Sequence, residues 1–207
     1  MKNLILLSLL LLLPCFLLAQ ERAPRPSGGF EEFFLNKTLR IDYFLAGNSK
    51  EENVFFREMR QEPYYGGPHK DLVLLKNTGT YRYCLIDSAS GKLLFAKGFS
   101  SLFQEWRGTP EAKLMRRAFP MTAAMPFPKT TMNFIIEKRV YETGLFEKIF
   151  EMKIRPDDYF ILNDSIHRFK VEKLRYSGDP SDHVDVAFLA EGYTLSLIHI
   201  SEPTRPY

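Results

Sequence analysis

Short runs that alternate apolar and polar residues, separated by turn signals, recur along the chain from residue 33 to residue 174. In the segment TLRIDYFLA, every second position is apolar, which places four side chains on one face of a strand: Leu39, Ile41, Tyr43 and Leu45. Aromatic residues make up 14% of the sequence, and aromatic side chains favour half-buried strands. We therefore predict an all-β domain, an antiparallel β-sandwich, over residues 33–174.

Two turn signals predict β-hairpins within this domain. The segments TYRYCLID and KLLFAKGF flank residues 88–91, and the segments TMNFIIEKRVY and LFEKIFEMKI flank residues 142–144. Each short loop contains glycine, as hairpin connections often do. The segments DYFILN and HRFKVEKLRY are predicted to be further strands. Between the two hairpins, Thr-Pro-Glu at residues 109–111 is typical of a helix N-terminus, so a short helix is predicted over PEAKLMRR.

The first residues have the pattern of a secretory signal peptide. Lys2 precedes an apolar run from Leu4 to Leu18, which is shorter than the roughly 20 residues that cross a bilayer. We expect cleavage after Ala19, so that residues 1–19 are removed and no membrane anchor remains. The protein is then exported to the periplasm, the cell surface or the medium. Residues 20–32 are rich in proline, glycine and charge and predict a flexible leader.

The pattern changes again after the predicted sandwich. Residues 175–183 contain the turn-rich segment SGDPSD and predict a linker. In residues 184–194, VDVAFLAEGYT, the apolar run is nearly unbroken, which is typical of a strand covered on both faces. We expect it to be the first strand of an α/β domain, left without its sheet. Residues 195–207 resemble the in-frame translation of a sequencing adapter from Leu195 to Arg205, so we expect the natural sequence to differ after Thr194.

Charge and composition exclude some classes of function. The net charge of +3 is small and dispersed, whereas nucleic-acid binding needs a clustered basic face, so no nucleic-acid partner is predicted. After removal of the signal peptide, Cys84 is the remaining cysteine, and its place in an alternating strand predicts a small buried apolar side chain.

A search for catalytic patterns gives no candidate residues. The sequence has no His-Glu-x-x-His zinc motif, no Gly-x-Ser-x-Gly elbow and no phosphate-binding glycine loop. Adjacent acids at residues 31–32, 51–52 and 157–158 point apart on a strand or turn, and we interpret them as solvated faces rather than acid–base pairs. We therefore predict no catalytic, metal-binding or cofactor-binding residues in this chain.

Three aromatic residues are candidates for binding. Tyr64 and Tyr65 stand beside a Gly-Gly pair in the loop PYYGGPHKD, where they could stack on a sugar or grip a peptide. Trp106, the single tryptophan, lies in a different connection. The alternative, which the ordinary burial of aromatic side chains favours, is that these residues seal the ends of the sandwich.

Four segments carry a resemblance to a known family. GFEEFFLNKTLRIDYFLAGN, VFFREMRQEPYYGGPHK, GTYRYCLIDSASGKLLFAKGFSSLFQEW and YSGDPSDHVDVAFLAEGYT resemble the bacterial IgA-peptidase-type zinc metallopeptidases, metallopeptidase family sixty-four. The resemblance runs from about Gly29 to Thr194. It implies an exported protein in which an N-terminal β-sandwich precedes a zinc peptidase domain, and in which DVAFLAEGYT is the first catalytic-domain strand. The zinc ligands and catalytic Glu are expected further along, in a His-Glu-x-x-His segment.

Two hypotheses for function follow. In the first, the chain is the non-catalytic N-terminal domain of an exported zinc metallopeptidase and is itself inactive and without zinc. Its partners are then the missing C-terminal peptidase domain and a protein substrate. The alternative is a stand-alone secreted binding module, an adhesin or a carbohydrate-binding sandwich, with its site at Tyr64 and Tyr65. The doubly buried strand after the linker favours the first hypothesis, because a stand-alone sandwich does not need it.

Overall fold

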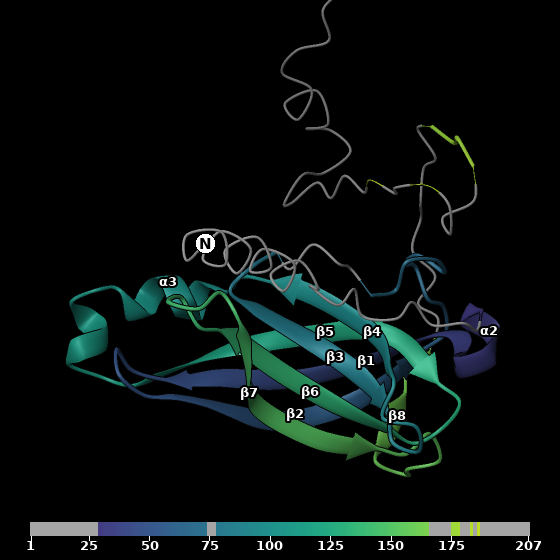
Figure 1. Cartoon of the computed structure of the whole chain (residues 1–207), viewed down its shortest axis with the longest axis horizontal. Helices are drawn as coiled ribbons and strands as arrows, with labels where there is room; N and C mark the ends of the chain where they lie inside the picture. Colours follow the sequence, from purple (N-terminus) through teal and green to yellow (C-terminus); the bar gives the residue numbers. More distant parts are fainter. Residues whose placement is uncertain (1–28, 74–77, 166–174, 179–182, 184–185, 187–207) are drawn as a thin grey trace, which may run out of the picture.

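Two four-stranded β-sheets packed face to face form the core of the computed structural model (Figure 1). The structure describes residues 29–73, 78–165, 175–178, 183 and 186. The first sheet has the order β5 (Arg117–Pro128), β1 (Phe34–Gly47), β2 (Glu52–Glu62) and β8 (Ile161–Asn163). The second sheet has the order β4 (Leu93–Phe99), β3 (Tyr81–Asp87), β6 (Met132–Arg139) and β7 (Phe146–Ile154). Neighbouring strands pair antiparallel except β2 and β8, which pair parallel. The predicted all-β sandwich is confirmed.

Both predicted hairpins are present. β3 pairs with β4 and β6 pairs with β7, each across a turn whose glycine, Gly91 or Gly144, has a φ of 70°. Such a φ favours glycine because it has no Cβ to clash. In the first turn, Asp87 Oδ2 accepts hydrogen bonds from Ser90 N at 2.9 Å and Ser90 Oγ at 2.6 Å. The Ser90 hydroxyl bond is the main cause that lowers the pKa of Asp87, because it stabilises the carboxylate.

The core follows the alternation along β1. Leu39, Ile41, Tyr43 and Leu45 are each at most 2% exposed and belong to one hydrophobic cluster between the sheets. The second sheet supplies the facing side chains to the same cluster: Tyr81, Tyr83, Leu85, Phe134 and Ile136. The alternation of apolar residues at every second position therefore predicted the buried face of this strand correctly.

The predicted helix over PEAKLMRR is wrong. There the chain forms only a three-residue 3₁₀ turn, η1 (Glu111–Lys113), and Arg117 already begins β5. Leu114 and Met115 are 88% and 48% exposed, so further turns would have no buried face to stabilise them. The helix of this connection is instead α3 (Leu102–Arg107), where Ser101 Oγ accepts a hydrogen bond from Gln104 N at 3.2 Å.

The N-terminal end of the sandwich begins earlier than the alternation suggested. Residues 30–32, assigned from sequence to the leader, lie in the short helix α2 (Phe30–Phe33), and Phe30 is 7% exposed.

Towards the C-terminus of the domain, only Ile161–Asn163 of the predicted strand DYFILN forms a strand. The signal peptide, residues 167–174 of the expected strand HRFKVEKLRY and most of residues 179–207 lie outside the described residues. Arg175, Tyr176 and Val186 are described and are not part of a strand. Within the described part, no helix is long and apolar enough to cross a membrane.

Candidate functional site

Tyr65 lies in an aromatic stack at the α2 end of the sandwich. Its ring centroid is 5.7 Å from that of Phe30, and the His69 ring stacks on Phe30 at 3.9 Å. Burial raises the pKa of Tyr65. Tyr64 is 67% exposed, while its backbone carbonyl accepts a hydrogen bond from Thr38 Oγ1 at 2.7 Å. The loop is thus fastened to β1 with one tyrosine packed inward and the other facing solvent.

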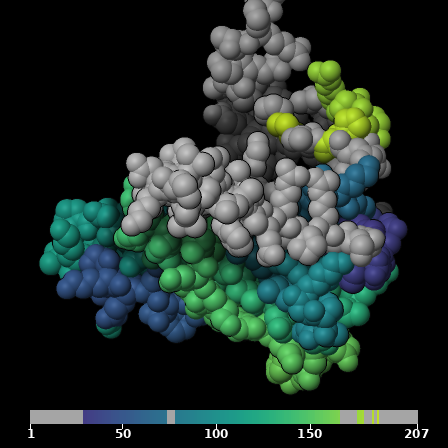
Figure 2. All heavy atoms as spheres, in the orientation of Figure 1, coloured from purple at the N-terminus to yellow at the C-terminus, as the bar shows by residue number. Residues whose placement is uncertain are grey.

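Trp106 lies at the opposite end, in α3. Its side chain is 8% exposed, packs against Phe103 and Phe119, and donates a hydrogen bond from Nε1 to Glu111 Oε2 at 2.7 Å. Figure 1 shows α2 and α3 at opposite ends of the sandwich, and the same two ends are purple and teal in Figure 2. The structure therefore does not bring Trp106 together with the two tyrosines. Trp106 and Tyr65 seal the ends of the sandwich, and of the three candidates Tyr64 remains the one open to a ligand.

Cys84 is buried in β3, as the alternation predicted. It is 3% exposed, and its Sγ lies 3.6 Å from Glu137 Oε2. Burial, followed by the nearby Glu137 carboxylate, raises the pKa of the Cys84 thiol to about 12. Because the thiolate is the reactive form, this thiol is unsuited to nucleophilic catalysis near neutral pH.

The Cys84 thiol is therefore expected to be nearly inert in the folded chain. A pKa of about 12 lowers the thiolate fraction at about pH 8 by roughly a thousandfold relative to a free thiol, and burial slows the reaction further. The measurement is the rate of reaction with Ellman's reagent in a Cys15→Ser background, which leaves Cys84 as the single thiol. Denaturant should restore the rate of a free cysteine. A fast reaction in the native chain would contradict the buried placement.

A buried charged cluster joins the two sheets near α3. The Glu52 side chain, at the start of β2, is 8% exposed and accepts hydrogen bonds from three side chains of other elements. Arg107 Nη1 lies 2.6 Å from Glu52 Oε2, and Tyr81 Oη lies 2.5 Å from Oε1. Lys138 Nζ also donates to Oε2. One carboxylate therefore connects β2, β3, β6 and α3.

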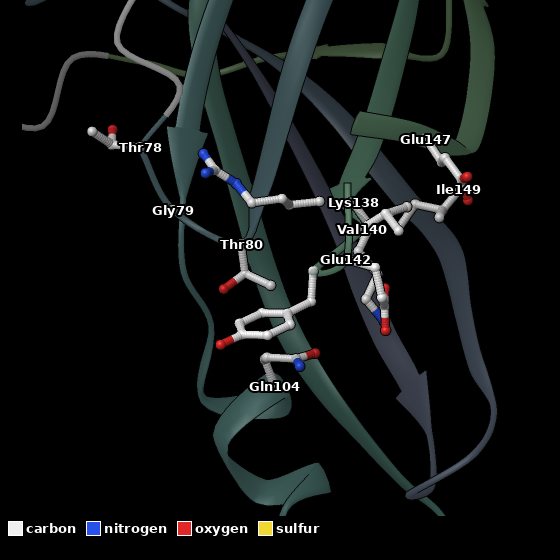
Figure 3. Close-up of a pocket in the computed structure, with 11 residues that line it drawn as sticks. Thr78, Gly79, Thr80, Gln104, Lys138, Val140, Glu142, Glu147 and Ile149 are labelled. Carbon is white, nitrogen blue, oxygen red and sulfur yellow. The ribbon is translucent and has the colours of Figure 1, made fainter. Parts of the chain in front are cut away.

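An open pocket of about 790 Å³ lies next to this cluster (Figure 3). Its walls come from the residues before β3, from α3, and from the hairpin of β6 and β7. The polar and aromatic side chains that line it are Thr78, Thr80, Gln104, Lys138, Arg139, Tyr141, Glu142 and Glu147. Sequence patterns did not single out these residues, because the chain brings them together from segments up to about 70 positions apart.

The described residues do not offer a zinc site. In the parts of the chain that the structure describes, no three His, Cys, Asp or Glu side chains converge as a metal-ligand group. His69 is stacked against aromatic rings, and Cys84 is buried beside a carboxylate. Tetrahedral zinc needs at least three converging protein ligands, so these residues do not fit the metal that the resemblance implies.

Comparison with models of protein families shows which family this sandwich belongs to. The family model described as "Peptidase M64 N-terminus" matches residues 29–151, from the residue before α2 into β7. The chain belongs to this family. The resemblance found in the sequence is confirmed, and the M64 N-terminal domain is the sandwich itself, with its core between the two sheets. The chain is thus the N-terminal region of a metallopeptidase of family M64.

Curated proteins of another kind also show similarity. The chain is 29% identical over 167 residues to arginine–tRNA ligase 2 of Bacillus thuringiensis and, at the same identity, to the arginine–tRNA ligases of Bacillus cereus and Bacillus anthracis. These matches cover 75% of the chain, and the chain spans about 29% of the length of the ligases. The activity of the ligases is therefore not carried over to the M64 N-terminal domain.

Proposed function

We propose that the M64 N-terminal domain is the non-catalytic part of an exported zinc metallopeptidase of the IgA-peptidase type. In this proposal it positions the catalytic module that follows it and helps bind a protein substrate. Zinc and the hydrolytic residues belong to the catalytic module, so no chemical step is assigned to the sandwich. The observation that carries the proposal is the way in which the chain leaves the sandwich through β8.

β8 fixes the exit of the chain to the edge of the first sheet. Ile161 is 8% exposed and pairs with Met59 of β2. Two polar contacts continue the attachment: Gln61 Nε2 donates to Asn163 Oδ1 at 3.0 Å, and Asp164 N donates to the Gln61 carbonyl at 2.9 Å. The segment that leads towards the next domain therefore starts from a fixed point at the edge of the first sheet, whereas a chain that left the sandwich unattached would start from an undefined position.

The free edge of β2 supports the role in binding protein. Among the residues that the structure describes, β8 covers β2 from Met59 to Gln61 and no strand pairs with this edge beyond them, where Phe55 and Phe56 are 56% and 41% exposed. An edge strand with exposed apolar side chains can accept an extended peptide as an added strand. β7, one of the two outer strands of the second sheet, differs because it carries exposed charges, among them the Lys148–Glu151 ion pair, which discourage strand addition.

Breaking the β8 attachment tests the positioning role. In the full-length metallopeptidase, Ile161→Asp places a charge at a buried contact with β2 and should release β8. We expect amide hydrogen exchange at residues 161–164 to accelerate, small-angle scattering to show a broader range of domain separations, and hydrolysis of a folded protein substrate to fall about tenfold. Hydrolysis of a short peptide should stay unchanged.

The matched control is Leu162→Asp on the same strand, because Leu162 is already 45% exposed and does not anchor β8 in the core. Unchanged scattering and unchanged hydrolysis of the folded protein in the Ile161→Asp enzyme would remove the positioning role. A gene that ends without a peptidase domain would favour the alternative, a stand-alone binding module.

A further inference from the structure

The pocket beside the β6–β7 hairpin has two different walls. In Figure 3, Thr78, Gly79 and Thr80 lie on one side with Gln104 below them, and Glu147 and Ile149 lie on the other side. The volume of about 790 Å³ falls within the range of roughly 300–1,000 Å³ that small-molecule sites occupy. Tyr141, which also lines the pocket, is 96% exposed at the hairpin turn.

The cations of the pocket are already engaged. Lys138 Nζ donates to the buried Glu52 carboxylate. The Arg139 guanidinium lies 5.0 Å from the centre of the Phe146 ring, in cation–π geometry. Because Glu142 and Glu147 also line the pocket, its two cations are balanced in number by two carboxylates, and the lining has no net positive charge for an anionic ligand such as a phosphate.

The neutral and acidic side chains that line the pocket have donors and acceptors that can bond to a ligand. Gln104 Oε1 lies 3.0 Å from Tyr81 Oη, whose single hydrogen also faces Glu52 Oε1 at 2.5 Å, and among the described residues the Gln104 Nε2 amide has no hydrogen-bond acceptor. Over the same residues, Glu142 and Glu147 form no ion pair. The hydroxyls of Thr78 and Thr80 add groups that both donate and accept.

We infer that this pocket binds a neutral sugar. Sugar hydroxyls need both acceptors and donors, and two carboxylates, one amide and two threonine hydroxyls around the same pocket provide them. The apolar C–H face of a pyranose ring needs an exposed aromatic ring, and Tyr141 presents one. An apolar ligand would leave this polar lining without partners, and an amine would use only the carboxylates.

The inference goes beyond the positioning role and does not rest on it. It also moves sugar binding away from Tyr64 and Tyr65, which lie at the α2 end, to the hairpin next to α3. A glycan attached to a protein would then be held by the sandwich independently of the free edge of β2.

Saturation-transfer NMR on the purified chain tests the inference with four free sugars as probes: galactose, mannose, fucose and N-acetylglucosamine. We expect at least one of them to bind with a Kd in the millimolar range. Tyr141→Ala should weaken that binding about tenfold, because the stacking surface is lost. Tyr141 is 96% exposed, so the variant should fold like the parent chain.

Two matched controls locate the site. Tyr159→Ala removes a tyrosine that is 83% exposed outside the pocket and should leave sugar binding unchanged, and Tyr64→Ala should also leave it unchanged. Loss of binding in Tyr64→Ala but not in Tyr141→Ala would overturn the assignment in favour of the α2 end.

A second series of measurements separates a sugar from a cation. Binding of a neutral sugar should be the same at about 0.05 M and about 0.5 M salt, whereas an amine held by Glu142 and Glu147 should bind more weakly at high salt. Butylamine is the probe for the cation. Salt-sensitive binding of butylamine together with no binding of any of the four sugars would overturn the inference.

Discussion

Replacing Glu52 with alanine is expected to lower the free energy of unfolding by about 3 kcal/mol, because it leaves the cations around it without their carboxylate. The Arg107 side chain is 12% exposed and lies 2.6 Å from Glu52 Oε2. Lys138, at 28% exposed, keeps part of its hydration, so the loss should fall at the lower end of the range for broken buried pairs. Tyr81 Oη would lose an acceptor as well.

The neighbouring residue supplies the control for this variant. Glu51 pairs with Arg116, but both side chains are more than half exposed, so Glu51→Ala should cost about 0.5 kcal/mol or less. Urea unfolding at neutral pH, monitored by tryptophan fluorescence from Trp106, measures both variants. Equal losses for the two would show that Glu52 does not hold the sheets together.

This pair of acids also shows where sequence patterns stop being sufficient. Residues 51–52 were interpreted as a solvated face because adjacent side chains point apart. They do point apart, and Glu51 is exposed, but Glu52 points into the structure. Its burial depends on Arg107 and Lys138, which lie 55 and 86 positions away, so no local pattern reveals it.

The strands and hairpins were predictable for a different reason. The alternation of Leu39, Ile41, Tyr43 and Leu45 is a local property that directly encodes which face of β1 is buried. Glycines in the turns encode the hairpins in the same way. α3 was missed because six residues carry too little periodicity. It is stabilised by the burial of Phe103 and Trp106, a tertiary effect.

The candidate site was less predictable than the fold. The exposed tyrosine and glutamate at residues 141–142 follow β6 directly and read as ordinary turn residues. Only the pairing of β3 with β6 brings them beside residues 78–80 and Gln104. Because the pocket is made by three segments that lie far apart in the sequence, no pattern within any one segment predicts it.

Four tyrosines, three of them buried and Tyr65 partly buried, are expected to make the sandwich unfold in alkali. Burial raises the pKa of Tyr43, Tyr65 and Tyr81, and it raises the pKa of Tyr83 to about 12. In the unfolded chain these hydroxyls should titrate near the reference value of about 10. Below that pH both states hold the protons, so the tyrosines leave the stability unchanged. Above it the unfolded state loses protons first, and the stability falls as the pH rises towards the folded values.

The size of this effect follows from the number of groups. Each tyrosine contributes up to about 1.4 kcal/mol per pH unit above about pH 10, so four together contribute about 5 kcal/mol per unit. The whole stability of a typical domain is roughly 5–15 kcal/mol, so unfolding is expected within about one to three pH units above pH 10. Thermal melts between about pH 8 and about pH 12 measure this loss of stability.

Tyr43→Phe keeps the buried ring and removes one titrating hydroxyl, so the decrease in stability per pH unit should become smaller by about a quarter. Tyr141→Phe, at a position 96% exposed, should leave the slope unchanged. If the melting temperature stays constant up to about pH 12, these tyrosines are not buried in the folded chain.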